Sequence, residues 1–133
     1  MKVYVFGNND YKQDKKAFLA AKKLKDNFPK LEFVEVDTNK DLPFESHRPV
    51  VILDTVEGIS EAELIETNDL DKLITKNSTS VHDFDLGFQL QYLKKLGKLG
   101  KVSIIGIPMK GKVDYLRIQL ILRKLVAQDI QGS

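Results

Sequence analysis

Apolar residues follow two alternating patterns along this chain. Short runs rich in β-branched and aromatic residues occupy residues 3–6, 31–36, 49–53 and 102–107, and the last two hold almost no polar side chain. Continuous apolar runs of this length are typical of strands covered on both faces of a sheet. The looser alternation in 31–36 predicts a strand near a sheet edge. The central run 49–53 is expected to end at Asp54.

Between these runs, apolar residues recur every three to four positions, which predicts helices over residues 14–28, 83–96 and 113–127. Gly97 stands where the second helix would take its C-terminal cap. The third helix is apolar on more than one side, so we expect burial against both the sheet and a neighbouring helix, with a second subunit as the alternative. On the second helix, the residues expected to face inward are Phe84, Phe88, Leu90, Leu93 and Leu96.

The alternation of strands and helices indicates an α/β fold, a three-layer sandwich with a mainly parallel twisted sheet flanked by helices. Residues 63–75 break this alternation and predict an antiparallel hairpin or a short edge strand. No repeat, linker or low-complexity segment interrupts the pattern, so residues 1–133 are expected to form a single domain.

The composition limits the kinds of metal site and catalytic site that the chain can form. The chain has 133 residues and no cysteine, which excludes disulfides, a thiolate nucleophile, iron–sulfur clusters and zinc sites built on sulfur. A metal ion would have to be held by oxygen and imidazole, and the two histidines are His47 and His82. His47 precedes the central strand and is therefore expected at the opposite edge of the sheet from the strand ends.

The net charge of +2 gives no general attraction to nucleic acid, and aromatic residues are not interleaved with the basic ones. The charge is unevenly spread, because residues 54–71 hold seven acids and no base whereas residues 12–30 hold seven lysines. These blocks are typical of solvated faces, with steering of a partner as the alternative. No apolar run is long enough to span a bilayer, and residues 1–6 lead straight into a strand rather than a secretory signal. We therefore expect a cytoplasmic monomer or weak dimer with no membrane partner.

Polar residues collect where the predicted parallel strands end. In such sheets, ligands bind outside the carboxyl ends of the strands. Asp14, Asp54 and His82 arrive there from three separate segments, and together they predict a metal site with oxygen and nitrogen ligands. Two of these residues also have a purely structural explanation. Asp14 would complement the positive end of its helix, and His82 would be an ordinary first-turn residue of a helix capped by Ser80. Asp54 is the hardest to explain structurally, because a buried acid needs a partner.

Nucleotide and serine-hydrolase chemistry find no support in the sequence. The turn that begins at Gly7 lacks the further glycines of a dinucleotide-binding fingerprint and the Gly-Lys-Ser/Thr of a phosphate-binding loop. The Gly-x-Ser-x-Gly motif of α/β-hydrolases does not occur. We therefore expect no nucleotide cofactor.

Four short motifs occur in the same order as in the nickel-hydrogenase maturation endopeptidases, which the chain resembles from residue 2 to about residue 108. A strand leads to the Gly7–Asn8 pair, with an acid six positions after the asparagine at Asp14. An apolar strand leads to Asp54, a Ser/Thr-rich loop precedes His82, and a last strand reads Ile-Gly-Ile-Pro over residues 105–108.

The resemblance implies an endopeptidase that removes the C-terminal extension of a hydrogenase large-subunit precursor after nickel has been inserted. It implies that Asp14, Asp54 and His82 contact the nickel, which the substrate carries, that Asp54 and Asp14 serve in catalysis, and that Gly7 and Asn8 bind substrate. One departure is the Gly-x-Gly that family members carry after the first turn, since residues 15–17 read Lys-Lys-Ala here. The alternative is a nonenzymatic relative that binds the metal or a maturation partner without cutting it.

Overall fold

The computed structural model describes residues 1–6, 15–36, 43–44, 49–56, 58–66 and 86–132. Strands and helices alternate over most of this length, as the pattern predicts. The elements are β1 (Lys2–Val5), α1 (Lys15–Asn27), β2 (Glu32–Glu35), β3 (Val50–Val56), β4 (Glu63–Glu66), α3 (Leu86–Lys95), β5 (Val102–Pro108) and α4 (Tyr115–Gly132).

The five strands form one sheet in the order β2-β1-β3-β5-β4. The pairs β1–β2, β1–β3 and β3–β5 are parallel, and β4 runs antiparallel to β5 at the sheet edge. The prediction of a mainly parallel sheet is confirmed, as are the edge position of β2 and an antiparallel edge strand within residues 63–66. The remainder of the predicted hairpin, from residue 67 onward, lies outside the described residues.

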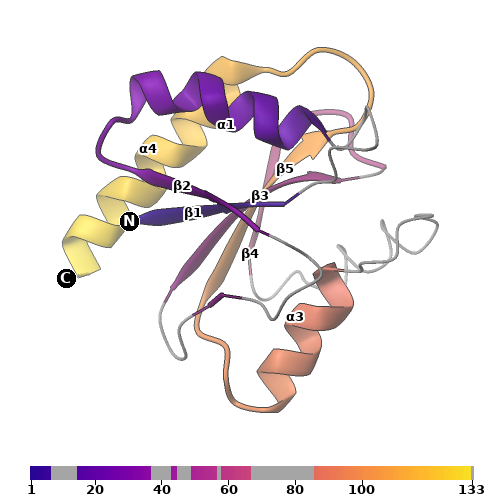
Figure 1. The fold of residues 1–133 in the computed structure, drawn as a ribbon, viewed down its shortest axis with the longest axis vertical. Coiled ribbons are helices and arrows are strands. Elements are labelled where there is room, and N and C mark those ends of the chain that lie inside the picture. The colour runs from indigo at the N-terminus through magenta and orange to yellow at the C-terminus, as the bar shows by residue number, and fades with distance from the viewer. Residues whose placement is uncertain (7–14, 37–42, 45–48, 57, 67–85, 133) are drawn as a thin grey trace.

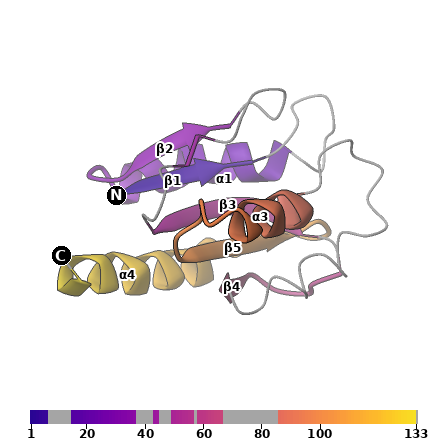
Figure 2. The ribbon, with the colours of Figure 1, turned by 90° about the horizontal axis from the view of Figure 1, so that it is seen from below.

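Helices cover both faces of the sheet, which gives the predicted three layers. Figure 1 shows α1 and α4 on one face and α3 on the other, and the view from below in Figure 2 places α3 across the middle of the sheet. On the α1/α4 side, Leu24 and Ile118 pack in one cluster with sheet residues such as Leu53. On the α3 side, Leu90 packs with Ile52 and other strand residues in a second cluster.

The helix ends follow local sequence signals. Gly97 adopts a φ of 69° directly after α3, so the predicted glycine cap is confirmed. Asp114 caps α4, because its Oδ1 accepts a hydrogen bond of 3.1 Å from the backbone N–H of Arg117. Among the described residues, no helix combines the length and the apolarity needed to cross a membrane.

Two expectations about these elements are wrong in detail, and a third is untested. The central strand does not end at Asp54 but continues to Val56, because pairing with β5 extends as far as Pro108. Leu96 is 49% exposed, since it lies past the last turn of α3 and beyond the reach of the sheet. Phe84 lies outside the described residues.

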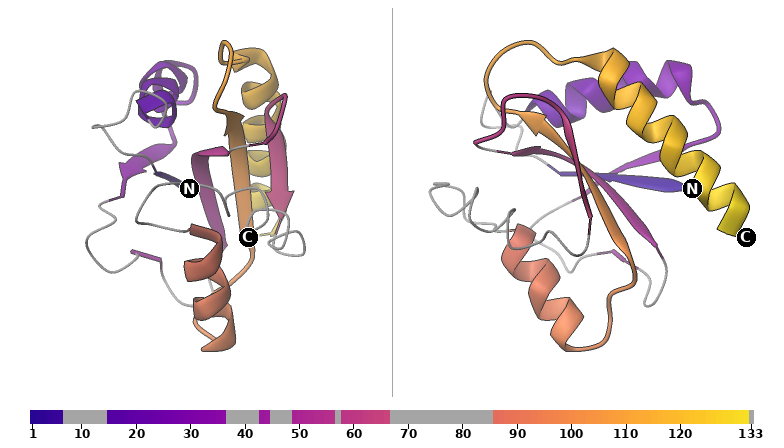
Figure 3. Two further views of the ribbon diagram at one scale, coloured as in Figure 1. Left: turned by 90° about the vertical axis from the view of Figure 1, so that its right-hand side faces the viewer. Right: turned by 180° about the vertical axis from the view of Figure 1, so that it is seen from behind.

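The last helix is also less buried than its apolar content suggested. Its sheet-facing side, which includes Ile118 and Leu122, is fully buried. Leu116 and Leu120 are 74% and 63% exposed, however, because at 3.6 residues per turn they project away from that side. The neighbouring helix α1 crosses α4 and contacts it (Figure 3), but it does not cover these two side chains.

Candidate functional site

The candidate site lies at the edge of the sheet where the parallel strands end. The last β1–β3 pair is Val5↔Leu53, and the Phe6 N–H donates a 2.9 Å hydrogen bond to the Leu53 carbonyl. Strand β3 then continues past the end of β1. Asp54 is therefore the first residue of β3 beyond the last β1–β3 pair, at the edge where ligands bind in sheets of this type.

Asp54 shares a row of the sheet with a second carboxylate. It is in register with Gly106 of β5, and Glu63 of β4 is in register with the same glycine from the other side. Residues in direct register project to the same face, so both acids lie on the α3 face. Two strand spacings separate their Cα atoms by about 9–10 Å. Both residues are half-buried.

Gly106 leaves bare backbone between these two acids. A Cβ atom built on Gly106 would lie 3.1 Å from Cγ2 of Val56 and 3.2 Å from Cδ1 of Ile59. Contacts this short are tighter than nine in ten of those that real Cβ atoms make, so the surrounding side chains favour glycine here. The glycine of the Ile-Gly-Ile sequence therefore has a packing role, beside any role in binding.

Arg117 fixes the segment that leads to Glu63. Its Nε donates a 2.5 Å hydrogen bond to the Ala62 carbonyl, and its guanidinium lies 3.4 Å from the Glu61 carboxylate. The chain is thus attached to α4 immediately before β4 begins. The sequence pattern alone did not indicate this contact, because the two residues are 55 positions apart.

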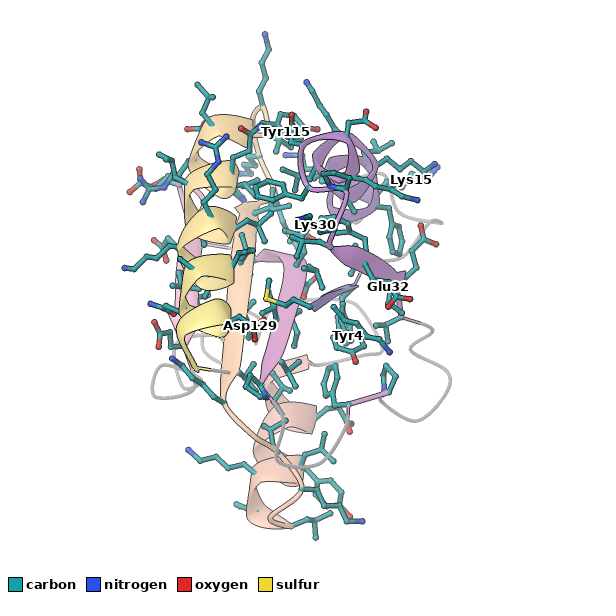
Figure 4. The ribbon with its side chains drawn as sticks, turned by 90° about the vertical axis from the view of Figure 1, so that its left-hand side faces the viewer. Tyr4, Lys15, Lys30, Glu32, Tyr115 and Asp129 are labelled. Carbon is teal, nitrogen blue, oxygen red and sulfur yellow. The ribbon has the colours of Figure 1, made fainter. Side chains whose placement is uncertain are left out.

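Lys16 joins the first turn of α1 to the loop that follows β5. Its ammonium donates to the carbonyls of Pro108, Met109 and Gly111 at 3.2, 2.6 and 2.7 Å. Burial lowers the pKa of this ammonium below 10.5. Lys15, by contrast, is exposed, as Figure 4 shows. Lys16 therefore has a structural function, because it attaches the start of α1 to the end of β5 and the loop that follows it.

Asp54 is the one predicted site residue that the structure describes. Gly7, Asn8, Asp14 and His82 all lie outside the described residues, as does His47. Within the described part of the chain, no group of three histidine or acidic residues could hold a metal ion. The three-residue metal site therefore stays a prediction. Glu63 and Lys16 were not singled out as site residues in the sequence, because their positions depend on contacts with β5.

Comparison with known proteins rests on structure alone. No family model matches the sequence, and no curated protein matches it. Among solved structures, the hydrogenase maturating endopeptidase HybD from E. coli superposes with a TM-score of 0.65 over 100% of this chain and 94% of its own, at 17% identity. The chain has the fold of that endopeptidase.

Two further structures share the fold. An endopeptidase from Escherichia coli matches with a TM-score of 0.58 at 17% identity, over 81% of this chain and 74% of its own. An uncharacterized protein from Wolinella succinogenes matches with a TM-score of 0.53 at 14% identity, over 97% of each chain. Sequence identities this low show that the fold is shared, but they do not show a shared activity.

Proposed function

We propose that this protein is a cytoplasmic endopeptidase that removes the C-terminal extension of a nickel hydrogenase large-subunit precursor. The observation that carries the proposal is the position of Asp54 at the strand-end edge, in register with Gly106, within a fold that matches a hydrogenase maturating endopeptidase over the whole chain. A half-buried carboxylate at this edge of the sheet is a suitable metal-contacting group.

In this proposal, the nickel belongs to the substrate. Asp14, Asp54 and His82 contact it, and imidazole and carboxylate oxygen are both acceptable ligands for nickel. The bound ion polarises the scissile carbonyl or lowers the pKa of the attacking water. Asp54 then takes up the proton as general base. Cleavage is conditional on nickel, because the same ion brings substrate and protease together.

The test is to incubate the protein with a nickel-loaded large-subunit precursor and with the nickel-free precursor, and to follow the shortened product by mass spectrometry. We expect cleavage of the loaded precursor alone. Asp54→Asn keeps the size of the side chain and removes its charge, and it should slow cleavage by about 100-fold or more.

Asp26→Asn is the matched control, because Asp26 is an exposed aspartate on α1, remote from the strand ends. It should cleave at the normal rate. Normal cleavage by a folded Asp54→Asn variant would exclude Asp54 as base. The proposal of peptidase activity itself fails if the unaltered protein leaves the loaded precursor intact.

The second candidate is a nonenzymatic relative that binds the nickel-bearing or maturation partner. The start of α1 favours it, because residues 15–17 contain no glycine and Lys16 is hydrogen-bonded to three carbonyls, so this segment lacks the flexibility that a Gly-x-Gly sequence would give it. Co-migration with the loaded precursor in size-exclusion chromatography without any cleavage would support this candidate. Cleavage would exclude it.

A further inference from the structure

The outer side of the helical layer exposes three leucines. Five large hydrophobic side chains are exposed in the described part of the chain, and three of them lie on α1 and α4. Leu19 of α1 is 57% exposed, and Leu116 and Leu120 of α4 are 74% and 63% exposed. Leu116 and Leu120 are one helical turn apart, so their side chains are neighbours on the helix surface.

Both helices present these leucines in the same direction, away from the sheet. On α4, the buried residues Ile118 and Leu122 face the sheet, and Leu116 and Leu120 project from the opposite side. On α1, Ala17 and Leu24 are buried in the same cluster, and Leu19 projects from the opposite side. The exposed leucines therefore belong to one layer surface rather than to scattered positions.

The two helices are in contact, and they cross at an angle in the view from behind in Figure 3. A direct contact joins them, because the Lys23 ammonium lies 4.2 Å from the centre of the Tyr115 ring. Figure 4 shows the Tyr115 side chain between the two helices. We call the surface formed by Leu19, Lys22, Leu116, Leu120, Arg123 and Lys124 the outer helical face.

The outer helical face belongs to the most basic part of the molecule. Helix α1 contains five lysines and one aspartate, and α4 contains three basic residues and one aspartate. The two helices together carry a net charge of +6, whereas the whole chain carries +2. Much of the lysine block in the sequence thus lies on this layer, beside the exposed leucines.

We propose that the outer helical face docks an acidic amphipathic helix of a partner protein. Leucines spaced by one turn fit the apolar side of such a helix, and the surrounding Lys22, Arg123 and Lys124 complement its carboxylates. This proposal is independent of the proposed peptidase activity, because it uses none of the residues at the strand ends.

Other occupants fit less well. A second copy of the chain would place one strongly basic layer against another, and like charges in apposition oppose association. A nucleic acid would match the charge but not the leucines, since stacking on bases needs exposed aromatic rings. A membrane surface calls for a larger apolar face than the three exposed leucines provide.

The test uses a synthetic peptide of about 14 residues, made of Leu, Glu and Ala with leucines at helical spacing and glutamates beside them. Fluorescence polarisation measures its binding to the full chain at low and high salt. We expect saturable binding that weakens with salt. Leu116→Ser/Leu120→Ser should weaken it about tenfold or more, and Arg123→Glu/Lys124→Glu should weaken it as much and remove most of the salt dependence.

The matched control is Tyr92→Ser/Leu96→Ser, which changes two exposed apolar residues on the α3 side of the molecule. It should leave the affinity unchanged, and circular dichroism should show that all variants are folded. The absence of saturable binding would overturn the proposal, as would equal weakening by the control.

Two further results would assign the face to another occupant and so overturn the proposal. One is a dimer in sedimentation velocity that Leu116→Ser/Leu120→Ser dissociates. The other is binding to vesicles of phosphatidylcholine and phosphatidylserine that the same variant abolishes while peptide binding is unaffected.

Discussion

Replacing Lys16 with methionine should lower the free energy of unfolding by about 1–2 kcal/mol. The change removes three hydrogen bonds from the ammonium to carbonyl oxygens, at 3.2, 2.6 and 2.7 Å, and keeps most of the aliphatic stem. The bond to Gly111 is solvent-exposed and counts for little. The two partly buried bonds contribute about 1–1.5 kcal/mol each, and the side-chain entropy released on their loss offsets about 1 kcal/mol.

Urea denaturation followed by circular dichroism measures this difference. For a chain of 133 residues, a loss of about 1–2 kcal/mol corresponds to a fall in Tm of about 4–7 °C. Amide hydrogen exchange should also speed up in the loop after β5, since Lys16 attaches that loop to α1. Lys15→Met is the control, because this neighbouring lysine is exposed.

The effect should depend on pH in a defined direction. Burial lowers the pKa of Lys16 below 10.5, so the folded protein releases this proton at a lower pH than the unfolded chain. Between the two pKa values the unfolded state binds more protons than the folded state. As the pH is raised through this range, the free energy of unfolding of the unaltered protein should therefore increase relative to that of Lys16→Met. Equal stability of Lys16→Met and Lys15→Met at neutral pH would refute the role assigned to the three hydrogen bonds.

Further substitutions test the packing and the cap of α4. Gly106→Ala should cost about 1–3 kcal/mol, because its Cβ would lie 3.1 Å from a side-chain methyl of β3; a stabilised variant in urea denaturation would contradict this. Asp114→Ala should cost about 1 kcal/mol by removing the cap on α4, and Asp114→Asn should recover most of it in the same measurement. Leu90→Ala should cost about 2–5 kcal/mol because the side chain is fully buried, whereas Leu96→Ala, at an exposed position, should change the thermal midpoint little.

The strands and helices were largely predictable because the apolar pattern records burial. Strand β5 is buried along its whole length and reads as a continuous apolar run, as does most of β3. The pattern failed where apolar side chains are exposed. On α4, Leu116 and Leu120 are as apolar as their buried neighbours, and they are exposed because they lie on the side of the helix opposite the sheet.

Of the residues at the candidate site that the structure describes, the sequence predicted only Asp54. Asp54 stands out because it follows an apolar run, and the structure places it at the expected edge. The register of Glu63 could not be read from the sequence, because β4 pairs with a strand that begins 36 residues after β4 ends. The structural role of Lys16 likewise depends on carbonyls more than 90 positions away in the sequence.

The position of β5 in the sheet has a consequence for how the chain folds as it is made. Among the described strands, β4 pairs with β5 alone, and β3 also needs β5 to cover one side, yet β5 is synthesised after both of them. At ordinary translation rates, the stretch between β4 and β5 takes about 2–7 s to produce. During that time the apolar edge of β3 has no partner strand, so the nascent chain passes through a period in which it is open to aggregation or to protection by a chaperone.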